Sequence, residues 1–394
     1  MSPSYDVAIV GGGAIGSSIA YFLLSDPAFH GTVAVIERDP SYKRASSALS
    51  ASAIRQQFST PENIRMSRFG IEFLREIGRY LGIDDSGSLD IGLQERGYLY
   101  LAAPSHEAVM RENHAIQRAE GAEVVLLTPE ELAIRFPWLA LDGVVLGSLG
   151  LKSEGWFDGY GLVQAYRRKA IALGAVFLAA EAVGIELEGP RVVGVRLADG
   201  SELACGTIVN AAGPWAREVA AMAGVALPVE ARRRCVFVFD ARRQLPDCPL
   251  VIDTSGVWFR PEGEYFISEA APPEQEDVAD LPLEVDRRQF EERLWPALAE
   301  RVPAFEAIKV VNAWAGYYEV NTFDRNAILG PHPEITNLYL ANGFSGHGLM
   351  QSPAVGRAIS ELIVHGRYVT LDLSIFGYER IAAGRPVVEK NVIG

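Results

Sequence analysis

The chain has 394 residues, of which 49% are hydrophobic and 22% are charged, a composition typical of globular proteins. Its length predicts two to three domains. The net charge of −14 argues against a nucleic-acid partner, because surfaces that bind nucleic acids are basic. The three cysteines, Cys205, Cys235 and Cys248, lack a CxxC spacing and a nearby histidine pair. We therefore predict no disulfide framework and no metal site, and we expect a cytoplasmic location.

The first predicted elements form a nucleotide-binding unit. An apolar strand over 7–10 runs into GGGAIG, where Gly11, Gly13 and Gly16 have the GxGxxG spacing, and the next strand ends in Glu37. In such a unit the glycines permit a tight turn, a close approach to a pyrophosphate and close packing of helix on strand. The N-terminus of the following helix faces the phosphates. Glu37 is predicted to accept hydrogen bonds from a ribose diol, which argues against a 2′-phosphorylated cofactor.

The middle of the chain alternates between two kinds of segment. Two strands that meet at Asp199-Gly200 are a predicted hairpin, and the apolar strand TIVNAA ends before Gly213, which predicts a second approach of backbone to nucleotide. Residues 88–147 and 226–315 instead hold aromatic-rich strands such as GYLYLAA and RCVFVFDA. These strands favour a separate sheet that walls a substrate site.

A further glycine cluster, NGFSGHGL, begins at Asn342 and leads into a predicted helix. Glycine-rich backbone before a helix again stabilises an anion. Two such sites exceed the needs of one pyrophosphate, and a flavin explains the second, because the reduced ring carries negative charge near N1.

The predicted fold is therefore α/β, with two domains that are both discontinuous in sequence. A Rossmann-like FAD-binding domain is predicted from 1–87, 148–225 and 316–394. An α+β substrate domain with an antiparallel sheet is predicted from 88–147 and 226–315.

Four segments, GGGAIG, SSALSASAIRQQFSTPENI, NAAGPW and GFSGHG, are arranged as in the D-amino-acid-oxidase (DAO) family of FAD enzymes, which the chain resembles over nearly its whole length. That family includes sarcosine oxidase, glycine oxidase and dimethylglycine dehydrogenase. Longer strings such as EGWFDGYGL and AWAGYYEVNTFDRN resemble a narrower group, associated with assembly of mitochondrial complex I. We expect no mitochondrial leader, so the chain resembles a bacterial relative of that group.

The resemblance implies non-covalent FAD. Gly316 stands where some members carry the attaching cysteine, and residues 46–60 hold no histidine. The predicted FAD contacts come from the glycine clusters, strand ends and the loop before Arg55: Gly11, Gly13, Ala14, Ile15, Gly16, Glu37, Arg38, Ser46, Ser47, Ser52, Ala53, Val183, Ala212, Gly213, Trp215, Gly316, Gly343, Ser345, Gly346, His347, Gly348, Leu349 and Met350.

The resemblance also supplies candidate substrate-binding cations. It places Arg55 beside the flavin, where a planar guanidinium can hold a carboxylate bidentately. The second cation of the family corresponds to Met350 here, and Arg260 is the candidate replacement. A salt bridge from Arg260 to Glu262 or Glu264 is the equal alternative.

Three further residues are candidates for the flavin end of the site. His347 resembles the histidine that flanks the ring and tunes its charge. Tyr317 and Tyr318 match aromatic positions near the flavin, with core packing as the alternative. Family oxidases carry a lysine that promotes reaction with oxygen, whereas GEYFISEAA has none and Phe266 is nearest to that position. This absence predicts a dehydrogenase rather than an oxidase.

We therefore expect a FAD enzyme that oxidises a small amine, a secondary or N-substituted amino acid, by hydride transfer to flavin N5. The electron acceptor is not identified by the sequence. Two alternatives stay open: a 2-hydroxy-acid dehydrogenase, which would use the same carboxylate clamp, and a flavoprotein that assists assembly of a respiratory complex through peripheral association. An NAD-dependent dehydrogenase is the weakest reading, because it leaves the C-terminal glycine cluster unexplained.

Overall fold

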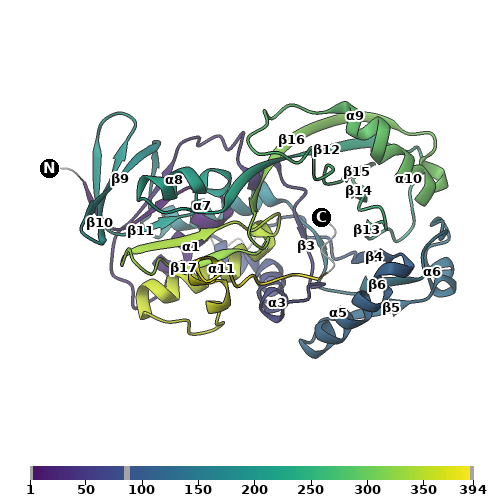
Figure 1. Ribbon diagram of the computed structural model, residues 1–394, viewed down its shortest axis with the longest axis horizontal. Helices are drawn as coiled ribbons and strands as arrows, with labels where there is room; N and C mark the ends of the chain where they lie inside the picture. Colours follow the sequence, from purple (N-terminus) through teal and green to yellow (C-terminus); the bar gives the residue numbers. More distant parts are fainter. Residues whose placement is uncertain (1–2, 84–88, 391–394) are drawn as a thin grey trace.

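The computed structural model describes residues 3–83 and 89–390, which form two eight-stranded sheets at opposite ends of an elongated molecule (Figure 1). The first sheet has the order β17-β18-β11-β1-β2-β8, and the hairpin β9–β10 pairs with β11. Its strands are β1 (Ser4–Val10), β2 (Val33–Glu37), β8 (Val176–Ala179), β9 (Ala182–Glu188), β10 (Arg191–Leu197), β11 (Glu202–Asn210), β17 (Ile328–Pro331) and β18 (Leu338–Asn342).

Strand β1 lies at the centre of this sheet, parallel to β11 on one side and β2 on the other. Its last four residues are buried, as expected for a parallel strand that is covered on both faces. The helices α1 (Ala14–Ser25), α7 (Gly159–Ala172) and α11 (Gly348–His365) cover one face, and α8 (Ala216–Met222) covers the other. Parallel strands between helical layers confirm the predicted Rossmann-like architecture.

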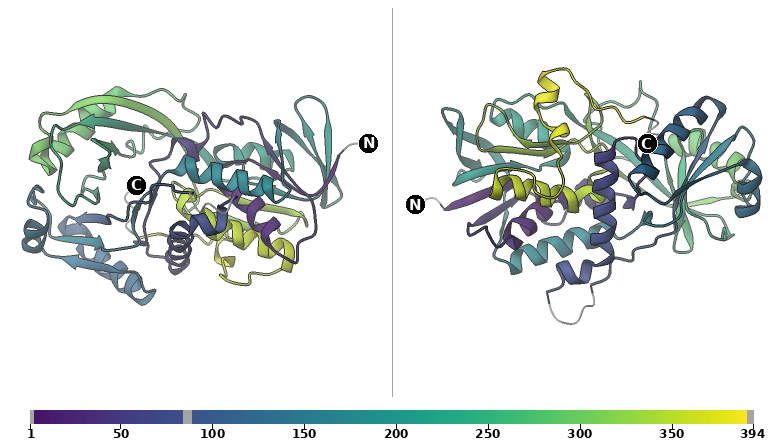
Figure 2. Two further views of the ribbon diagram at one scale, coloured as in Figure 1. Left: turned by 180° about the vertical axis from the view of Figure 1, so that it is seen from behind. Right: turned by 90° about the horizontal axis from the view of Figure 1, so that it is seen from below.

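The second sheet has the order β16-β12-β15-β14-β13-β4-β6-β5 and is antiparallel except where β13 pairs with β4. One face packs on an apolar cluster with helices of the same domain, and the other faces the first domain (Figure 2). Its strands are β4 (Tyr98–Ala102), β5 (Val124–Leu127), β6 (Leu146–Gly150), β12 (Val229–Asp240), β13 (Leu250–Ile252), β14 (Trp258–Glu262), β15 (Tyr265–Glu269) and β16 (Lys309–Asn321).

The short strands β3 (Ala53–Ile54) and β7 (Gly155–Trp156) pair with each other. The remaining helices are α2 (Ser46–Leu49), α3 (Pro61–Arg75), α4 (Ile77–Leu81), α5 (Glu107–Ala119), α6 (Pro129–Arg135), α9 (Arg287–Gln289), α10 (Trp295–Arg301) and α12 (Glu379–Ala382). Single turns of other helix types are η1 (Pro104–His106), η2 (Gly213–Trp215), η3 (Phe290–Leu294), η4 (Pro303–Phe305) and η5 (Ser374–Phe376).

Both domains are built from separated segments, as the fold prediction required, but two predicted boundaries fall inside strands. The boundary at 147/148 cuts β6, and the boundary at 315/316 cuts β16, which runs from the second sheet to the cavity between the domains. The 13-residue strand β16 serves both domains and has no turn residue to mark the change. The predicted segments over 1–2, 84–88 and 391–394 lie outside the described residues.

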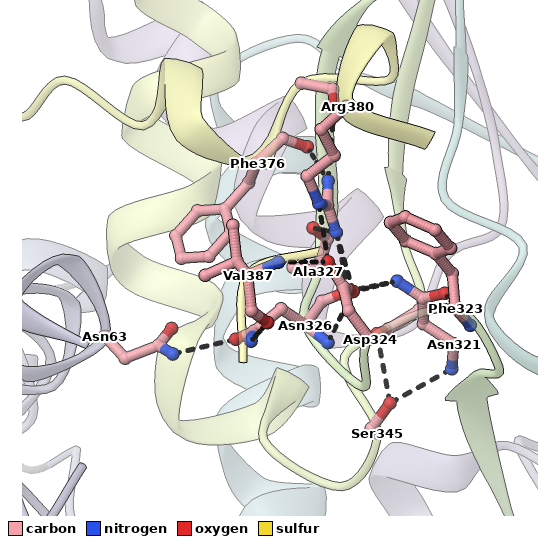
Figure 3. A network of polar contacts seen from close by, with 12 residues as sticks. Asn63, Asn321, Phe323, Asp324, Asn326, Ala327, Ser345, Phe376, Arg380 and Val387 are labelled. Atoms are coloured by element: carbon pink, nitrogen blue, oxygen red, sulfur yellow. Dashed lines mark hydrogen bonds and ion pairs between the residues drawn. The ribbon is translucent and has the colours of Figure 1, made fainter. Parts of the chain in front are cut away.

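The C-terminal tail returns to the middle of the molecule and is held by a polar network (Figure 3). Arg380 forms an ion pair with Asp324, whose carboxylate also accepts a hydrogen bond from Val387 N at 3.0 Å. Asn326 accepts from Asn63 Nδ2 at 2.8 Å and donates to Val387 O at 2.8 Å. The tail is thereby joined both to the turn after β16 and to helix α3.

Over the described ranges, no helix has the length and apolar character needed to cross a membrane. The three cysteines are buried and unpaired.

Candidate active site

A cavity of about 630 Å³ extends from the first glycine loop to the second sheet, a volume within the usual range of small-molecule sites. Gly11 and Gly13 line one end, and Arg234, Glu269 and Tyr318 line the other. Segments from both domains therefore build one elongated site.

The glycines at the first end are required by close backbone approaches. Gly11 has φ of +103°, and a Cβ there would lie 2.3 Å from the carbonyl oxygen of Ala211. A Cβ on Gly16 would lie 1.9 Å from the carbonyl oxygen of Gly11. Helix α1 begins at Ala14 without a side-chain cap, so its first N–H groups remain available to phosphate oxygens.

Glu37 lines the cavity at the end of β2. Its carboxylate accepts hydrogen bonds from Gly12 N and Asp39 N, both at 2.8 Å. Burial raises the pKa of Glu37, and these two hydrogen bonds act in the opposite direction. Each carboxylate oxygen can still accept a further bond, as a ribose diol requires.

Two arginines and one tryptophan lie close to Glu37 in the cavity lining. The guanidinium carbon of Arg38 lies 3.7 Å from the centre of the Trp215 ring, and that of Arg44 lies 5.5 Å from it. All three residues line the cavity. Such stacking orders the two arginines at a place where a dinucleotide is negatively charged.

Two polar atoms of the cavity lining test whether a dinucleotide fits. The hydroxyls of Tyr42 and Ser46 are buried, and neither finds a hydrogen-bond partner in the part of the chain that the structure describes. Unpartnered buried hydroxyls cost free energy, so these atoms favour a polar ligand. With the glycine cradle and Glu37, the lining fits the FAD that the resemblance implies.

The second glycine cluster forms the start of α11. Gly346, Gly348 and Leu349 line the cavity, and His347 precedes the first helical residue. Gly346 has φ of +96°, and a Cβ there would lie 2.5 Å from a ring carbon of Tyr318. The 18-residue helix α11 therefore brings the positive end of its dipole close to the cavity.

Arg55 and His347 are buried behind this loop and joined by a contact of 2.9 Å between Arg55 Nη2 and His347 Nε2. Burial lowers the pKa of His347 well below its ordinary value, and the charge of Arg55 lowers it further. The imidazole is therefore neutral, and its Nε2 accepts the hydrogen bond from Arg55. Neither residue lines the cavity itself.

Arg55 stands in an aromatic cage. Its guanidinium carbon lies 4.7 Å from the Phe58 ring centre and 5.9 Å from the ring centres of Tyr98 and Tyr100. No described carboxylate lies at ion-pair distance from Arg55, although the buried carboxyl group of Glu154 acts on its charge from farther away. The Nε of Arg55 has no acceptor among the described residues. A buried cation of this kind favours an anionic ligand.

The loop that carries Arg55 is held by Glu154. This buried carboxyl accepts from Gln56 N at 2.6 Å and from Gln57 Nε2 at 2.8 Å. Burial raises the pKa of Glu154 to about 7, although the hydrogen bonds lower it. The first bond fixes the backbone immediately after Arg55, and the second ties the Gln57 side chain to the same carboxyl group.

Like Arg55, Arg260 and Met350 stand outside the cavity lining. Arg260 pairs with Glu262 and donates to Ala51 O at 2.8 Å, which agrees with the salt-bridge alternative. Met350 is buried in the core, and its carbonyl oxygen would lie 2.6 Å from a Cβ on Gly70.

A cation that the sequence analysis missed lies at the second-sheet end of the cavity. Arg234 is buried and donates two hydrogen bonds to Asp277, at 2.7 and 3.1 Å. Its Nε lies 3.9 Å from Glu269, which accepts from Trp258 Nε1 at 2.7 Å. Because Arg234 shares a strand face with Val236 and Val238, the alternation of RRRCVFVFD was the available signal.

Tyr317 and Tyr318 both line the cavity. The Tyr317 hydroxyl donates to Leu281 O at 2.7 Å, so that side chain is tied to the wall. Burial and the charge of Glu269 raise the pKa of Tyr318, whereas the charges of Arg234 and Arg55 lower it. The guanidinium carbon of Arg234 lies 5.2 Å from the centre of the Tyr318 ring.

Most of the predicted FAD contacts line the cavity: Gly11, Gly13, Ala14, Ile15, Glu37, Arg38, Ser46, Ser47, Ala212, Gly213, Trp215, Gly316, Gly346, Gly348 and Leu349. The others stand outside the lining: Gly16, Ser52, Ala53, Val183, Gly343, Ser345, His347 and Met350. Val183 is exposed on β9, whereas its neighbour Ala182 lines the cavity, because successive strand residues face opposite sides. Gly343 and Ser345 shape the loop instead, through hydrogen bonds with Glu319 and Asn321.

The family model described as "FAD dependent oxidoreductase" (DAO) matches residues 6–362. The chain is 44% identical to FAD-dependent oxidoreductase domain-containing protein 1 of Xenopus laevis, over 98% of this chain and 85% of that protein. It is 28% identical to the glycine oxidase of Geobacillus kaustophilus, over 96% and 98%.

A solved structure, the L-proline dehydrogenase of P. horikoshii, is similar with a TM-score of 0.86 and 26% identity, covering 98% of this chain and all of that one. The family match, the relatives and the fold agree with the geometry of the cavity. The chain belongs to the DAO family of FAD-dependent oxidoreductases.

Proposed function

We propose that the protein is a dehydrogenase that oxidises a small amine, a secondary or N-substituted amino acid, to the imine. The observation that carries this proposal is Arg55, a buried guanidinium just outside the cavity lining with no described carboxylate at ion-pair distance. Burying a charge without a partner is costly, and a substrate carboxylate matches the planar fork. The similarity to an L-proline dehydrogenase supports the same class, since proline is a secondary amino acid.

The chain's own residues bind and orient the substrate. Arg55 holds the carboxylate, and neutral His347 fixes one guanidinium nitrogen without adding charge. Burial raises the pKa of Tyr98 and Tyr100, so both hydroxyls stay protonated and add no negative charge beside the carboxylate. FAD, when bound, supplies the hydride acceptor, and the protein's contribution is orientation and electrostatics.

The cavity lining supports a dehydrogenase. The cations that line the cavity are Arg38, Arg44 and Arg234, and no lysine of the described chain joins them. The lysine that promotes oxygen reactivity in family oxidases therefore has no counterpart in this lining. Electrons would pass instead to another acceptor.

Anaerobic bleaching of the flavin with a substrate panel tests the proposed function. The panel comprises N-methyl amino acids and proline, primary amino acids, 2-hydroxy acids, and amines without a carboxylate. We expect rapid bleaching with the first group and slow bleaching with amines that lack a carboxylate. Bleaching by 2-hydroxy acids alone would assign the other dehydrogenase class. No response to any compound would refute catalysis of this kind and favour a flavoprotein that assists complex assembly.

A stopped-flow experiment on the reduced protein tests which electron acceptor it uses. Mixed with oxygen, it should reoxidise slowly, and mixed with an artificial quinone acceptor, rapidly. Reoxidation by oxygen that keeps pace with substrate turnover would make the protein an oxidase.

A further inference from the structure

Glu319, on β16, is a half-buried carboxyl group that the proposed reaction does not use. It lines the cavity, and its Oε2 accepts a hydrogen bond from Gly343 N at 3.3 Å. It forms no ion pair within residues 3–83 and 89–390. A carboxyl group with one neutral partner facing a ligand cavity needs an explanation.

The position of this carboxyl group is set by the two glycine loops that approach the cofactor. A Cβ on Gly348 would lie 3.3 Å from Glu319 Oε1, and a Cβ on Gly213 would lie 3.9 Å from Oε2. Gly348 begins α11, Gly213 follows β11, and both line the cavity. The carboxyl group thus stands where both loops reach the FAD site.

An ionised carboxylate is unfavourable at this place. The N-terminus of α11 favours a ligand anion, and a second negative charge beside that anion would repel it. Burial raises the pKa of Glu319 to about 8, opposed only by the hydrogen bond from Gly343. At neutral pH the group is therefore protonated, and its O–H is a hydrogen-bond donor.

The elements packed around Glu319 carry other charged or titratable groups, but these have partners elsewhere. Arg232 pairs with Glu230, Arg217 pairs with Glu218 and Asp280, Asp324 pairs with Arg380, His347 accepts from Arg55, and Arg44 lies over Trp215. None of them forms an ion pair with Glu319 in the described chain. No cation in the described chain is paired with Glu319, so an ionised Glu319 would carry an uncompensated negative charge.

We propose that Glu319 binds FAD as a neutral acid, donating a hydrogen bond to an acceptor atom of the cofactor between the two glycine loops. The inference rests on the family's cofactor and not on the proposed amine substrate. Its tests therefore succeed or fail independently of the substrate panel.

The first test measures FAD affinity of the apoprotein from pH 7 to 9.5 by quenching of flavin fluorescence. If only the protonated form binds well, the Kd rises as pH passes the pKa of Glu319, because binding then requires proton uptake. We expect a Kd about 30-fold higher at pH 9.5 than at pH 7. In Glu319→Gln, which keeps a donor but cannot ionise, we expect wild-type affinity at pH 7 and no such rise.

Two further variants make the test specific. Glu319→Ala removes the donor and should bind FAD more weakly at every pH, while circular dichroism of the apoprotein shows whether it is folded. Glu269→Gln changes another buried carboxyl group of the same cavity, one bound to Trp258, and should keep the wild-type pH dependence. The proposal is overturned if Glu319→Gln retains the alkaline loss of affinity, or if Glu269→Gln abolishes it.

A spectroscopic test needs no cofactor turnover. The infrared difference spectrum of wild-type apoprotein between pH 7 and 9.5 should show loss of a protonated carboxyl band, and Glu319→Gln should lack that band. A band that is equally strong in the variant would show that Glu319 does not titrate in this range, and would overturn the proposal.

Discussion

At the scale of single residues, Arg55 and His347 act as one unit. The neutral imidazole of His347 accepts a hydrogen bond from Arg55 Nη2. Arg55 Nε has no partner among the described residues. Burial is the main cause of the low pKa of His347, and protonation would in addition place two cations 2.9 Å apart. The unit therefore presents a single positive charge to a ligand over the physiological pH range.

This arrangement predicts the effect of Arg55→Lys. Lysine keeps the charge but loses the planar fork and the bond to His347, and a charge-assisted hydrogen bond contributes about 1.5–3 kcal/mol. We expect kcat/KM for carboxylate substrates to fall by about 10- to 100-fold, mainly through KM, while the flavin spectrum is unchanged. Steady-state kinetics across the amine panel measures it.

Arg260→Lys is the matched control. Arg260 is also buried on the substrate side, but it is engaged by Glu262 and Ala51, so its replacement should leave KM within a few-fold of wild type. Equal losses in both variants would contradict a specific role for Arg55.

Residues were predictable to different degrees. Arg55 came from its place in the family loop, and Gly11 and Gly16 from their spacing, because a missing Cβ is a local requirement. Val183 was one residue away from the lining residue Ala182, since sequence gives a strand more readily than its facing side. Arg234 and Glu319 escaped notice because their function depends on contacts between segments distant in sequence.

At the scale of elements, helix α3 has an unusual cap. Its N-cap residue Thr60 makes no capping bond of its own. The carboxylate of Glu389, from the C-terminal tail, instead accepts from Ser59 N at 2.7 Å and Thr60 N at 3.1 Å, and from Asn63 Nδ2 at 2.6 Å. A negative charge at a helix N-terminus is stabilising, so the tail supplies what the helix lacks.

We therefore expect Glu389→Ala to lower the free energy of unfolding by about 1–2 kcal/mol. Chemical denaturation measures the loss, and proteolysis should cleave the tail faster. Val388→Ala, an exposed neighbour, should change neither value. A normal stability for Glu389→Ala, or an equal loss for Val388→Ala, would show that the contact with α3 is incidental.

Element prediction followed local signals. The hairpin at Asp199-Gly200 is confirmed by the antiparallel pairing of β10 with β11, and α1 follows its glycine loop directly. The parallel pairing of β13 with β4 had no such signal, because neighbours in a sheet that are distant in sequence are chosen by packing. The same reason explains the boundaries placed inside β6 and β16.

At the scale of the whole molecule, FAD joins the two domains without a covalent bond in our prediction. After acid precipitation the polypeptide should then be colourless and have its unmodified mass. Free FAD at 100 times its Kd should stabilise the fold by about 2.7 kcal/mol, which raises Tm with FAD concentration. A yellow precipitate with an increased polypeptide mass would contradict non-covalent binding, and a Tm independent of FAD would contradict the linkage.

The order of strands in the first sheet has a consequence for synthesis of the protein. The first strand made, β1, lies between β2 and β11, so its full pairing waits until the ribosome has translated residues 202–210. The second glycine cluster at 343–348 and Glu389 emerge later still. A nascent chain therefore exposes the pyrophosphate loop long before it can retain a flavin, and the supply of cofactor matters chiefly after the chain has left the ribosome.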